Sequence, residues 1–390
     1  MARIVISGYY GFDNLGDEAV LVGIISALRQ ELKESGLPQK EKRIGFYREE
    51  REPLEIVVLS NQPEVTAARY QVESVYRNDL RAVLREISRC DLLISGGGSL
   101  LQDVTSWRTI PYYLSQVFFA QLRGKKTVFY AQGVGPIKGR GGRLFVRLIA
   151  NRTDLITVRD RNSRDFFIEL GVDPGLIKIT SDPVFALKGR EWTESEKLLQ
   201  EKGMKAKVKA DIRKEKPLIG ISVRPWGDNS YLEKVARTAD FISGLTGGEI
   251  IIIPMHYRQD QEVSRKLAGL LASKVRILSD RYDPLEMLKL FARLDFLLGV
   301  RLHSLIFAAL QHLPFVALSY DPKVKGFLEM LGVNSLMELD DLDVESLKRV
   351  CQAVWENREK FITLLEHKME DFYQQAIYNA RLVLDLLNYK

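Results

Sequence analysis

Short apolar runs alternate with amphipathic segments along most of the chain. The apolar runs are typical of parallel strands buried on both faces, and the segments between them carry apolar residues at helical spacing. In the first half we predict strands at 3–7, 55–59, 91–95, 127–131, 155–158 and 177–180, and helices at 16–34, 79–87, 109–122, 144–150 and 163–170. This alternation predicts an α/β fold whose parallel sheet is covered by helices on both faces.

A polar segment at 188–216, rich in Lys and Glu, interrupts the alternation before it resumes. In the second half we predict strands at 218–223, 249–253, 275–278, 295–298 and 315–318, helices at 231–243, 261–271, 284–291 and 305–311, and helices from 344 to the end. The pattern predicts two Rossmann-like domains facing a cleft. The N-terminal domain is expected at 1–187, the linker at 188–216, the C-terminal domain at 217–360, and a helix crossing back to the first domain at 361–390.

Composition places the chain among soluble globular proteins. Of its 390 residues, 46% are hydrophobic and 28% are charged, and no apolar run reaches the roughly 18 residues of a membrane span. Cys90 and Cys351 match no metal or redox spacing, which favours a reducing compartment and no metal site. The net charge of +6 weakly favours anionic partners, but the absence of a basic tail argues against nucleic acid.

In the first half, polar and glycine-rich clusters follow the predicted strands. Asp13 and Asn14 lie in a loop that runs into the first helix, and Asp13 is the better functional carboxylate of that loop. The glycine spacing there is not the dinucleotide-binding fingerprint. Gly97, Gly98 and Asp103 form a second cluster, in which successive glycines would let a ligand approach the backbone closely. A third cluster, at 132–136, is followed by Arg140, Arg143 and Arg147. Either a solvated helix face or an anion site would explain these arginines.

In the second half, cationic and imidazole side chains follow most of the strands. They are Arg224, His256, the run Arg301-Leu302-His303, and Lys323. Ligands of parallel α/β sheets bind at the carboxyl ends of strands, where helix N-termini favour anions. An arginine there can hold a carboxylate or phosphate through two hydrogen bonds, and a histidine can move a proton near neutral pH. These residues predict a small, multiply anionic ligand held without metal or cofactor.

Together these clusters, from Gly8 to Lys323, resemble the polysaccharide pyruvyl transferase family, and within it the CsaB type. The resemblance implies a fold similar to the GT-B glycosyltransferases and phosphoenolpyruvate as donor substrate. It also implies a lipid-linked disaccharide containing N-acetylmannosamine as acceptor, a 4,6-pyruvate ketal as product, and a role in anchoring S-layer proteins to the cell wall. The expected location is the cytoplasm, with peripheral contact at the inner membrane surface.

The resemblance and the strand-end chemistry together suggest roles. We expect Arg301, Leu302, Arg224, Lys323 and His256 to bind the donor. His303 would be the acid or a phosphate contact, Asp13 the base from the other domain, and Arg147 or Arg143 a further site residue. Acceptor or cleft contacts are expected from Asn14, Gly97, Gly98 and Asp103.

Two other functions fit the same residues. A GT-B glycosyltransferase could use the cations to hold the diphosphate of a nucleotide sugar. A non-catalytic sugar- or anion-binding protein could share the fold, because fold alone does not fix function.

Overall fold

The computed structural model describes residues 2–34, 40–44, 47–51, 54–104, 106–188 and 216–388. The predicted linker at 188–216 therefore lies almost wholly outside the described residues. The chain divides into two compact units. The N-terminal unit comprises Met1–Phe12, Asp17–Leu187 and Phe372–Lys390, and the C-terminal unit comprises Asp13–Gly16 and Lys188–Asp371.

An eight-stranded parallel sheet forms the centre of the N-terminal unit, in the order β10-β9-β8-β6-β1-β4-β5, with β7 paired to β8. Its strands are β1 (Ala2–Tyr10), β4 (Leu54–Ser60), β5 (Glu73–Tyr76), β6 (Leu92–Ser95), β7 (Gly98–Leu101), β8 (Lys126–Val134), β9 (Leu155–Val158) and β10 (Ile177–Ile179). The strand order reverses between β1 and β6, where parallel α/β sheets usually open to a ligand.

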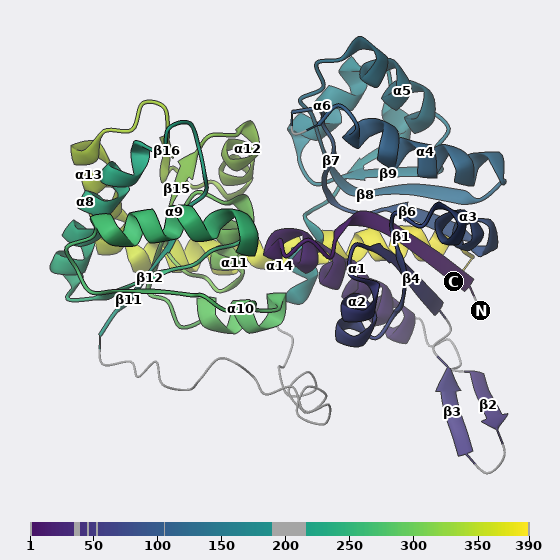
Figure 1. Cartoon of the computed structure of the whole chain (residues 1–390), viewed down its shortest axis with the longest axis horizontal. Coiled ribbons are helices and arrows are strands. Elements are labelled where there is room, and N and C mark those ends of the chain that lie inside the picture. The colour runs from purple at the N-terminus through teal and green to yellow at the C-terminus, as the bar shows by residue number, and fades with distance from the viewer. Residues whose placement is uncertain are drawn as a thin grey trace. The chain divides into compact units, whose positions relative to one another are not determined.

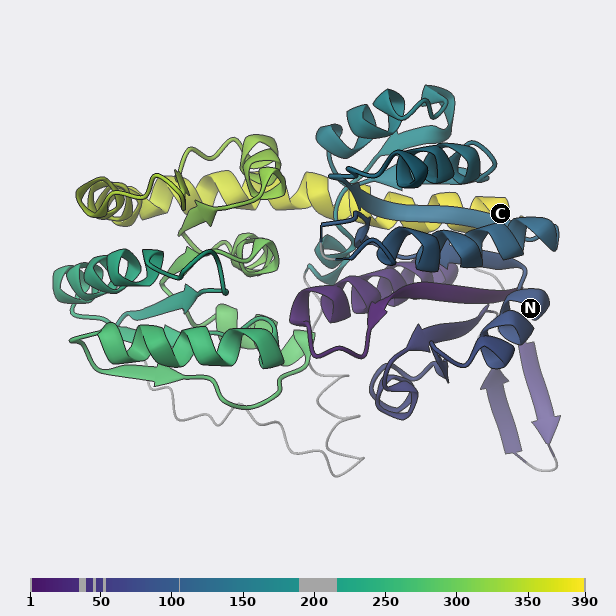
Figure 2. The same ribbon diagram turned by 45° about the horizontal axis from the view of Figure 1, so that its top comes forward.

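Helices cover both faces of this sheet (Figure 1). They are α1 (Leu15–Glu34), α2 (Pro63–Tyr70), α3 (Leu80–Arg89), α4 (Thr109–Leu122), α5 (Arg140–Ala150) and α6 (Arg161–Glu169), with 3-10 turns at Pro174–Leu176 and Pro183–Leu187. Apolar residues of α3, α4, α5 and α6 pack with alternate strand residues into one core. On the other face, α1 lies beside the end of the last helix, where Glu31 pairs with Arg381 at 3.0 Å (Figure 2). A separate antiparallel hairpin consists of β2 (Lys40–Ile44) and β3 (Tyr47–Arg51).

The C-terminal unit is built on a six-stranded parallel sheet in the order β13-β12-β11-β14-β15-β16. The strands are β11 (Leu218–Ser222), β12 (Glu249–Ile252), β13 (Val275–Ile277), β14 (Phe296–Gly299), β15 (Phe315–Ser319) and β16 (Leu336–Glu338). Numbered within the unit, this is the Rossmann order 3-2-1-4-5-6. The order in which successive strands are added to the sheet reverses between β11 and β14, which is the switch point of the sheet.

The helices of this unit are α8 (Tyr231–Thr246), α9 (Tyr257–Leu270), α10 (Pro284–Phe291), α11 (Leu302–Leu310), α12 (Pro322–Leu331), α13 (Val344–Glu356) and α14 (Arg358–Leu386). Residues of α8, α9 and α13 pack with β11, β12, β14 and β15 in one core. The α/β class and the parallel sheets are confirmed. The sequence analysis missed the short elements β5, β7, β16, α2 and α12 and the β2–β3 hairpin, since short runs carry little periodic signal.

Candidate functional site

Two arginines follow β11 and β14, the neighbouring strands between which the strand order of the C-terminal sheet reverses. Arg224 comes two residues after β11, and Arg301 caps α11 directly after β14. The turn at Arg301 is tight, because a Cβ on Gly299 would lie 2.7 Å from Leu305 Cδ2. The structure thus brings together two of the predicted donor-binding cations at the switch point of one sheet.

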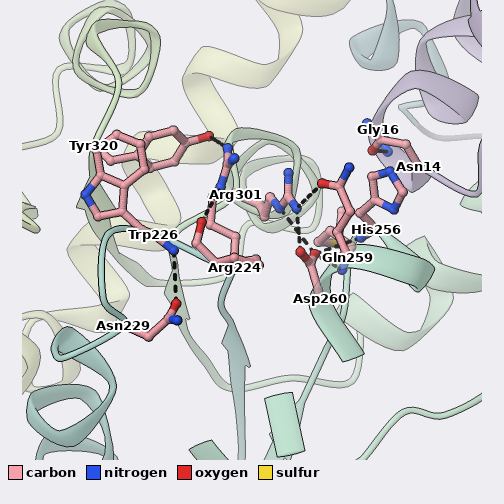
Figure 3. Close-up of polar contacts among 12 residues, drawn as sticks. Asn14, Gly16, Arg224, Trp226, Asn229, His256, Gln259, Asp260, Arg301 and Tyr320 are labelled. Carbon is pink, nitrogen blue, oxygen red and sulfur yellow. Dashed lines mark hydrogen bonds and ion pairs between the residues drawn. The ribbon is translucent and has the colours of Figure 1, made fainter. Parts of the chain in front are cut away.

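Asp260, in the first turn of α9, organises the surroundings of Arg301 (Figure 3). Its side chain is fully buried and forms a two-pronged ion pair with Arg301, in which Nε donates to Oδ2 at 3.2 Å and NH2 donates to Oδ1. The same carboxylate accepts the backbone N–H of Met255 at 3.2 Å and of His256 at 2.8 Å. Asp260 therefore fixes both the guanidinium of Arg301 and the backbone that presents His256.

Arg224 lies against aromatic side chains (Figure 3). Its guanidinium donates to the Tyr320 hydroxyl and lies 4.4 Å from the Tyr320 ring centre, and the Tyr320 ring is 4.7 Å from that of Trp226. The Tyr231 hydroxyl donates to the Arg224 carbonyl at 2.5 Å, and burial raises the pKa of Tyr231 to about 12. These contacts hold the arginine without neutralising its charge, so it can still bind an anion.

His256 is a buried side chain of this site. It is 5% exposed, and within the described part of the chain neither ring nitrogen has a hydrogen-bond partner. Burial, and then the charge of Arg301, lower the pKa of His256 below its usual 6.5, so the neutral imidazole is favoured. A buried imidazole without a partner is unusual and points to a ligand group.

The segment Asp13–Gly16 groups with the C-terminal unit, although the sequence analysis placed it in the N-terminal domain. The backbone of Asn14 forms an isolated antiparallel β-bridge with that of His256, and the Leu15 N–H donates to the Met255 carbonyl at 2.9 Å. A Cβ on Gly16 would lie 2.2 Å from Nδ1 of His303, so only glycine leaves room for this imidazole. The segment therefore lies against both predicted histidines.

The Asp13 side chain is 13% exposed and lies between two arginines. It accepts from Arg258 Nε at 3.1 Å, and Arg281 NH1 lies 3.5 Å from its other oxygen. Asp13 adopts a left-handed backbone with φ of 61°, a conformation that costs free energy in most residues but is tolerated by Asp. The predicted base is thus held by two cations of the same unit rather than isolated.

The remaining donor candidates lie at helix starts of this unit. Leu302 is the first residue of α11, next to His303. Lys323 lies in the first turn of α12, and its Nζ is 3.9 Å from Asp321 Oδ2. Asp321 also caps this helix by accepting the Lys323 N–H at 3.0 Å.

In the N-terminal unit, the glycines predicted to admit a ligand are packed against the protein itself. A Cβ on Gly97 would lie 3.0 Å from Val20 Cγ1, and Gly98 has a φ of +90° at the start of β7. The close approach there is between the strands and α1, so it requires no ligand.

The predicted cleft residues Asp103, Arg143 and Arg147 also have partners within the N-terminal unit. Asp103 accepts the backbone N–H groups of Lys138 and Gly139 at 2.9 and 2.8 Å and so fixes the chain that enters α5. Arg143 pairs with Glu169 at 2.5 Å, and the Arg147 guanidinium lies over Gly171. These contacts occupy the three side chains within the N-terminal unit, and their predicted role in the site stays a prediction.

Sequence reasoning missed Asp260, Arg258, Arg281 and Tyr320. The predicted helix at 261–271 begins earlier, at Tyr257, and this places Asp260 in its first turn. An acidic residue four positions after a strand-end histidine was an available signal, because carboxylates favour helix N-termini. The partners of Asp13 had no such signal, since they are about 250 residues away in the chain.

Within the described ranges, no group of three or more His, Cys, Asp and Glu side chains is placed to hold a metal ion. Cys90 and Cys351 are free and buried, and burial raises the pKa of each thiol to about 12. No helix in the described part of the chain has the length and apolar character needed to span a membrane.

Comparison with known sequences decides the family. The sequence model of the polysaccharide pyruvyl transferases matches residues 44–322, which is well over half of the chain. The chain belongs to the polysaccharide pyruvyl transferase family. A curated relative, the amylovoran biosynthesis protein AmsJ of Erwinia amylovora, is 21% identical to this family member, with 99% of each chain covered.

Solved structures resemble this family member in fold. Anabaena Alr3699/HepE in complex with UDP-glucose has a TM-score of 0.60 at 14% identity over the whole of both chains. The UDP-GlcNAc 2-epimerase of Neisseria meningitidis, bound to UDP-GlcNAc, has a TM-score of 0.65 at 11% identity, again over both whole chains. A glycosyltransferase of Rickettsia africae has a TM-score of 0.60 at 12% identity, covering 99% of this chain and 98% of that one. The fold is GT-B-like, with parallel sheets.

Proposed function

We propose that this protein transfers the enolpyruvyl group of phosphoenolpyruvate to a sugar of a cell-wall polysaccharide precursor and closes it into a cyclic ketal. The observation that carries the proposal is the cluster at the switch point of the C-terminal sheet. It combines Arg224 and Arg301 with His303 and with a neutral His256 that has no hydrogen-bond partner among the described residues. Phosphoenolpyruvate has a carboxylate and a phosphate, which arginine side chains bind through paired hydrogen bonds. Lys323, at the start of α12, is a further cation of the same unit.

The reaction needs three proton transfers and no change in oxidation state. A sugar hydroxyl oxygen bonds to C2 of phosphoenolpyruvate while its proton goes to a base and the methylene carbon takes a proton from an acid. The C2–O bond to phosphate then breaks and phosphate leaves. The oxygen of a second hydroxyl bonds to C2, and its proton goes to the departing phosphate. The product is a ketal whose former methylene is a methyl group.

Residues of the C-terminal unit can supply these roles. His303, at the start of α11, would give the proton to carbon or hold the phosphate, and Asp13 would take the hydroxyl proton. Arg258 and Arg281 fix the position of the Asp13 carboxylate. Asp260 orients Arg301, so it is a positioning residue rather than a catalytic one.

The finer identity of the acceptor follows the CsaB resemblance. We propose a lipid-linked disaccharide containing N-acetylmannosamine, a 4,6-ketal as product, and a cytoplasmic enzyme that prepares the polymer for S-layer anchoring. The name of the relative AmsJ, a biosynthesis protein, supports a role in making a polymer.

The test is phosphate release from phosphoenolpyruvate in the presence of the lipid-linked disaccharide, with mass analysis of the product. We expect Arg301→Ala to weaken donor binding and His303→Ala and Asp13→Ala each to lower the rate roughly 10²–10⁴-fold. Arg276→Ala is the matched control, because Arg276 is an exposed residue of the same unit that pairs with Glu249. Near wild-type rates in both His303→Ala and Asp13→Ala would refute the assignment.

A GT-B glycosyltransferase is the second candidate, since solved structures of similar fold hold UDP or UDP-sugars. Thermal denaturation with each ligand separates the two functions. A ligand at a hundredfold excess over its Kd stabilises the folded protein by about 2.7 kcal/mol. Stabilisation by UDP-GlcNAc and not by phosphoenolpyruvate would favour the glycosyltransferase.

A further inference from the structure

The positive charge of this chain is concentrated in one segment. Residues 104–153 contain nine Lys and Arg and no Asp or Glu, whereas the rest of the chain holds 48 Lys and Arg against 51 Asp and Glu. The segment includes α4, β8 and α5 of the N-terminal unit. The net charge of +6 therefore arises here, and an asymmetry of this size favours an anionic partner for this part of the surface.

The exposed face of α5 carries leucines among its arginines. Its inward face buries Val146, Ile149 and Ala150, while Leu144 and Leu148, four residues apart, are 56% and 51% exposed. Arg140 and Arg147 lie on the same exposed stripe at helical spacing. A helix facing only water would carry polar residues at the leucine positions.

The start of α5 also carries a charge of the unfavourable sign for a helix N-terminus. It begins at Arg140 and has no acidic residue in its first turn. Cations are unfavourable near a helix N-terminus, since the macrodipole is positive there. The arginine therefore adds nothing to helix stability at this position. The Asp103 carboxylate accepts the N–H groups of Lys138 and Gly139 just before the helix, and a further anion would offset the charge of Arg140.

Apolar exposure and cations continue along α4, which packs beside α5 (Figure 1). Leu122 and Phe118 are exposed and border a depression of about 340 Å³ whose charged lining residues are Lys125, Lys126, Arg152 and Asp154. Lys126 pairs with Asp154 at 2.8 Å. The Gln121 side chain, which also lines the depression, donates to the Ile149 carbonyl at 3.1 Å and so joins the ends of α4 and α5. Lys125 and Arg152 leave the depression with more positive than negative charge beside its apolar side chains.

An exposed tryptophan lies at the other end of α4. Trp107 is 72% exposed, with the Arg108 guanidinium 5.4 Å from its ring centre. The Asp103 carboxylate links the loop before it to the backbone at Lys138 and Gly139, at the start of α5. Tryptophan and arginine together are enriched where proteins meet the membrane–water interface.

We propose that the exposed surface of α4 and α5, here called the α4–α5 surface, docks onto an anionic lipid bilayer. Leu144, Leu148, Leu122 and Trp107 enter the headgroup region, and Arg140, Lys125 and Arg152 contact lipid phosphates. The exposed apolar side chains favour a bilayer over nucleic acid, whose phosphates would be met by cations alone. The proposal rests on the proposed function in one respect, because a lipid-linked acceptor would place the substrate at such a surface.

The test is co-sedimentation of the full chain with phosphatidylcholine vesicles made with and without phosphatidylglycerol. We expect binding only with phosphatidylglycerol, and weaker binding at high salt because screening shortens the reach of surface charges. The double variant Leu144→Asp/Leu148→Asp should bind the vesicles at least about tenfold more weakly than the wild type. Arg140→Gln should weaken binding about fivefold.

Leu80→Asp is the matched control, since Leu80 is a 67% exposed leucine on α3 of the same unit. It should bind like the wild type, and all variants should keep the wild-type melting temperature. Equal binding of the Leu144/Leu148 variant and the wild type would overturn the proposal. So would tighter binding to duplex RNA than to the vesicles, or a dimer in solution that the Leu144/Leu148 variant disrupts.

Phosphate release with a water-soluble disaccharide acceptor distinguishes a failure of the proposed function from a failure of membrane docking. This rate should be the same in the wild type and the Leu144/Leu148 variant. Its absence in both would count against the proposed function and not against membrane docking.

Discussion

His256 is buried, its ring nitrogens have no hydrogen-bond partner among the described residues, and its protonation depends on this environment. Burial, then Arg301, lower its pKa below 6.5, while in the unfolded chain it titrates near that value. Below about pH 6.5 the unfolded chain therefore binds the proton that the folded protein resists. The contribution of His256 to stability is present above that pH and is lost as the pH falls.

We predict that His256→Gln reduces the loss of unfolding free energy between pH 7.5 and pH 5.5. Urea denaturation at the two pH values measures it. Burial also lowers the pKa of His312, so part of the pH dependence should remain until His312→Gln is added. His367→Gln is the control, because His367 is exposed. A pH dependence unchanged by His256→Gln would show that this imidazole titrates normally in the folded protein.

At the scale of single elements, Asp103 shows how a strand-end carboxylate can serve a helix rather than a ligand. Burial alone would raise its pKa, but hydrogen bonds from the backbone of Gly139 and Lys138 outweigh burial and lower it. The carboxylate thus stabilises the entry to α5 above the usual pKa of Asp, and this contribution is lost as the pH falls below it.

We predict that Asp103→Ala lowers the free energy of unfolding by about 1 kcal/mol, which is the usual net contribution of a hydrogen bond. The measurement is urea denaturation at neutral pH, with Asp165→Ala as control because Asp165 is an exposed residue of α6 that pairs with Arg164. Phosphate release should remain near wild type. A large loss of turnover with unchanged stability would show that Asp103 acts in the functional site rather than in the stability of the N-terminal unit.

At the scale of the whole molecule, α14 serves both compact units. Its residues up to Asp371 belong to the C-terminal unit, where Phe361 packs edge-on to Phe315 at 5.2 Å. From Phe372 onward it belongs to the N-terminal unit. There Phe372 stacks on Phe185 at 4.9 Å, and Asn379 accepts from Thr180 at 2.9 Å.

Two substitutions in this one helix should destabilise different units. Phe372→Ala removes a buried ring and should cost the N-terminal unit about 3–5 kcal/mol. Phe361→Ala, at a half-buried ring, should cost the C-terminal unit less. Amide hydrogen exchange locates the effect, and each variant is the control of the other. Faster exchange in the same unit for both variants would contradict the division of the helix.

The sequence by itself determined the α/β class and the arginines and histidines that follow its strands. Parallel strands and amphipathic helices repeat locally, so the order of polar and apolar residues predicts them. For the same reason Arg224, His256 and Arg301 could be assigned to strand ends before any contact was known. The run Gly96-Gly97-Gly98 stays ambiguous from sequence, because close backbone approach has the same signature whether the neighbour is a ligand or α1.

Only the tertiary structure decided which residues lie together. It joined Arg301 to Asp260, placed Asn14 and Gly16 against His256 and His303, and set Asp13 between Arg258 and Arg281. It also showed that Leu144 and Leu148 are exposed on a helix whose other side is buried. These relations join residues distant in the chain or depend on which face of a helix finds a neighbour, and local spacing encodes neither.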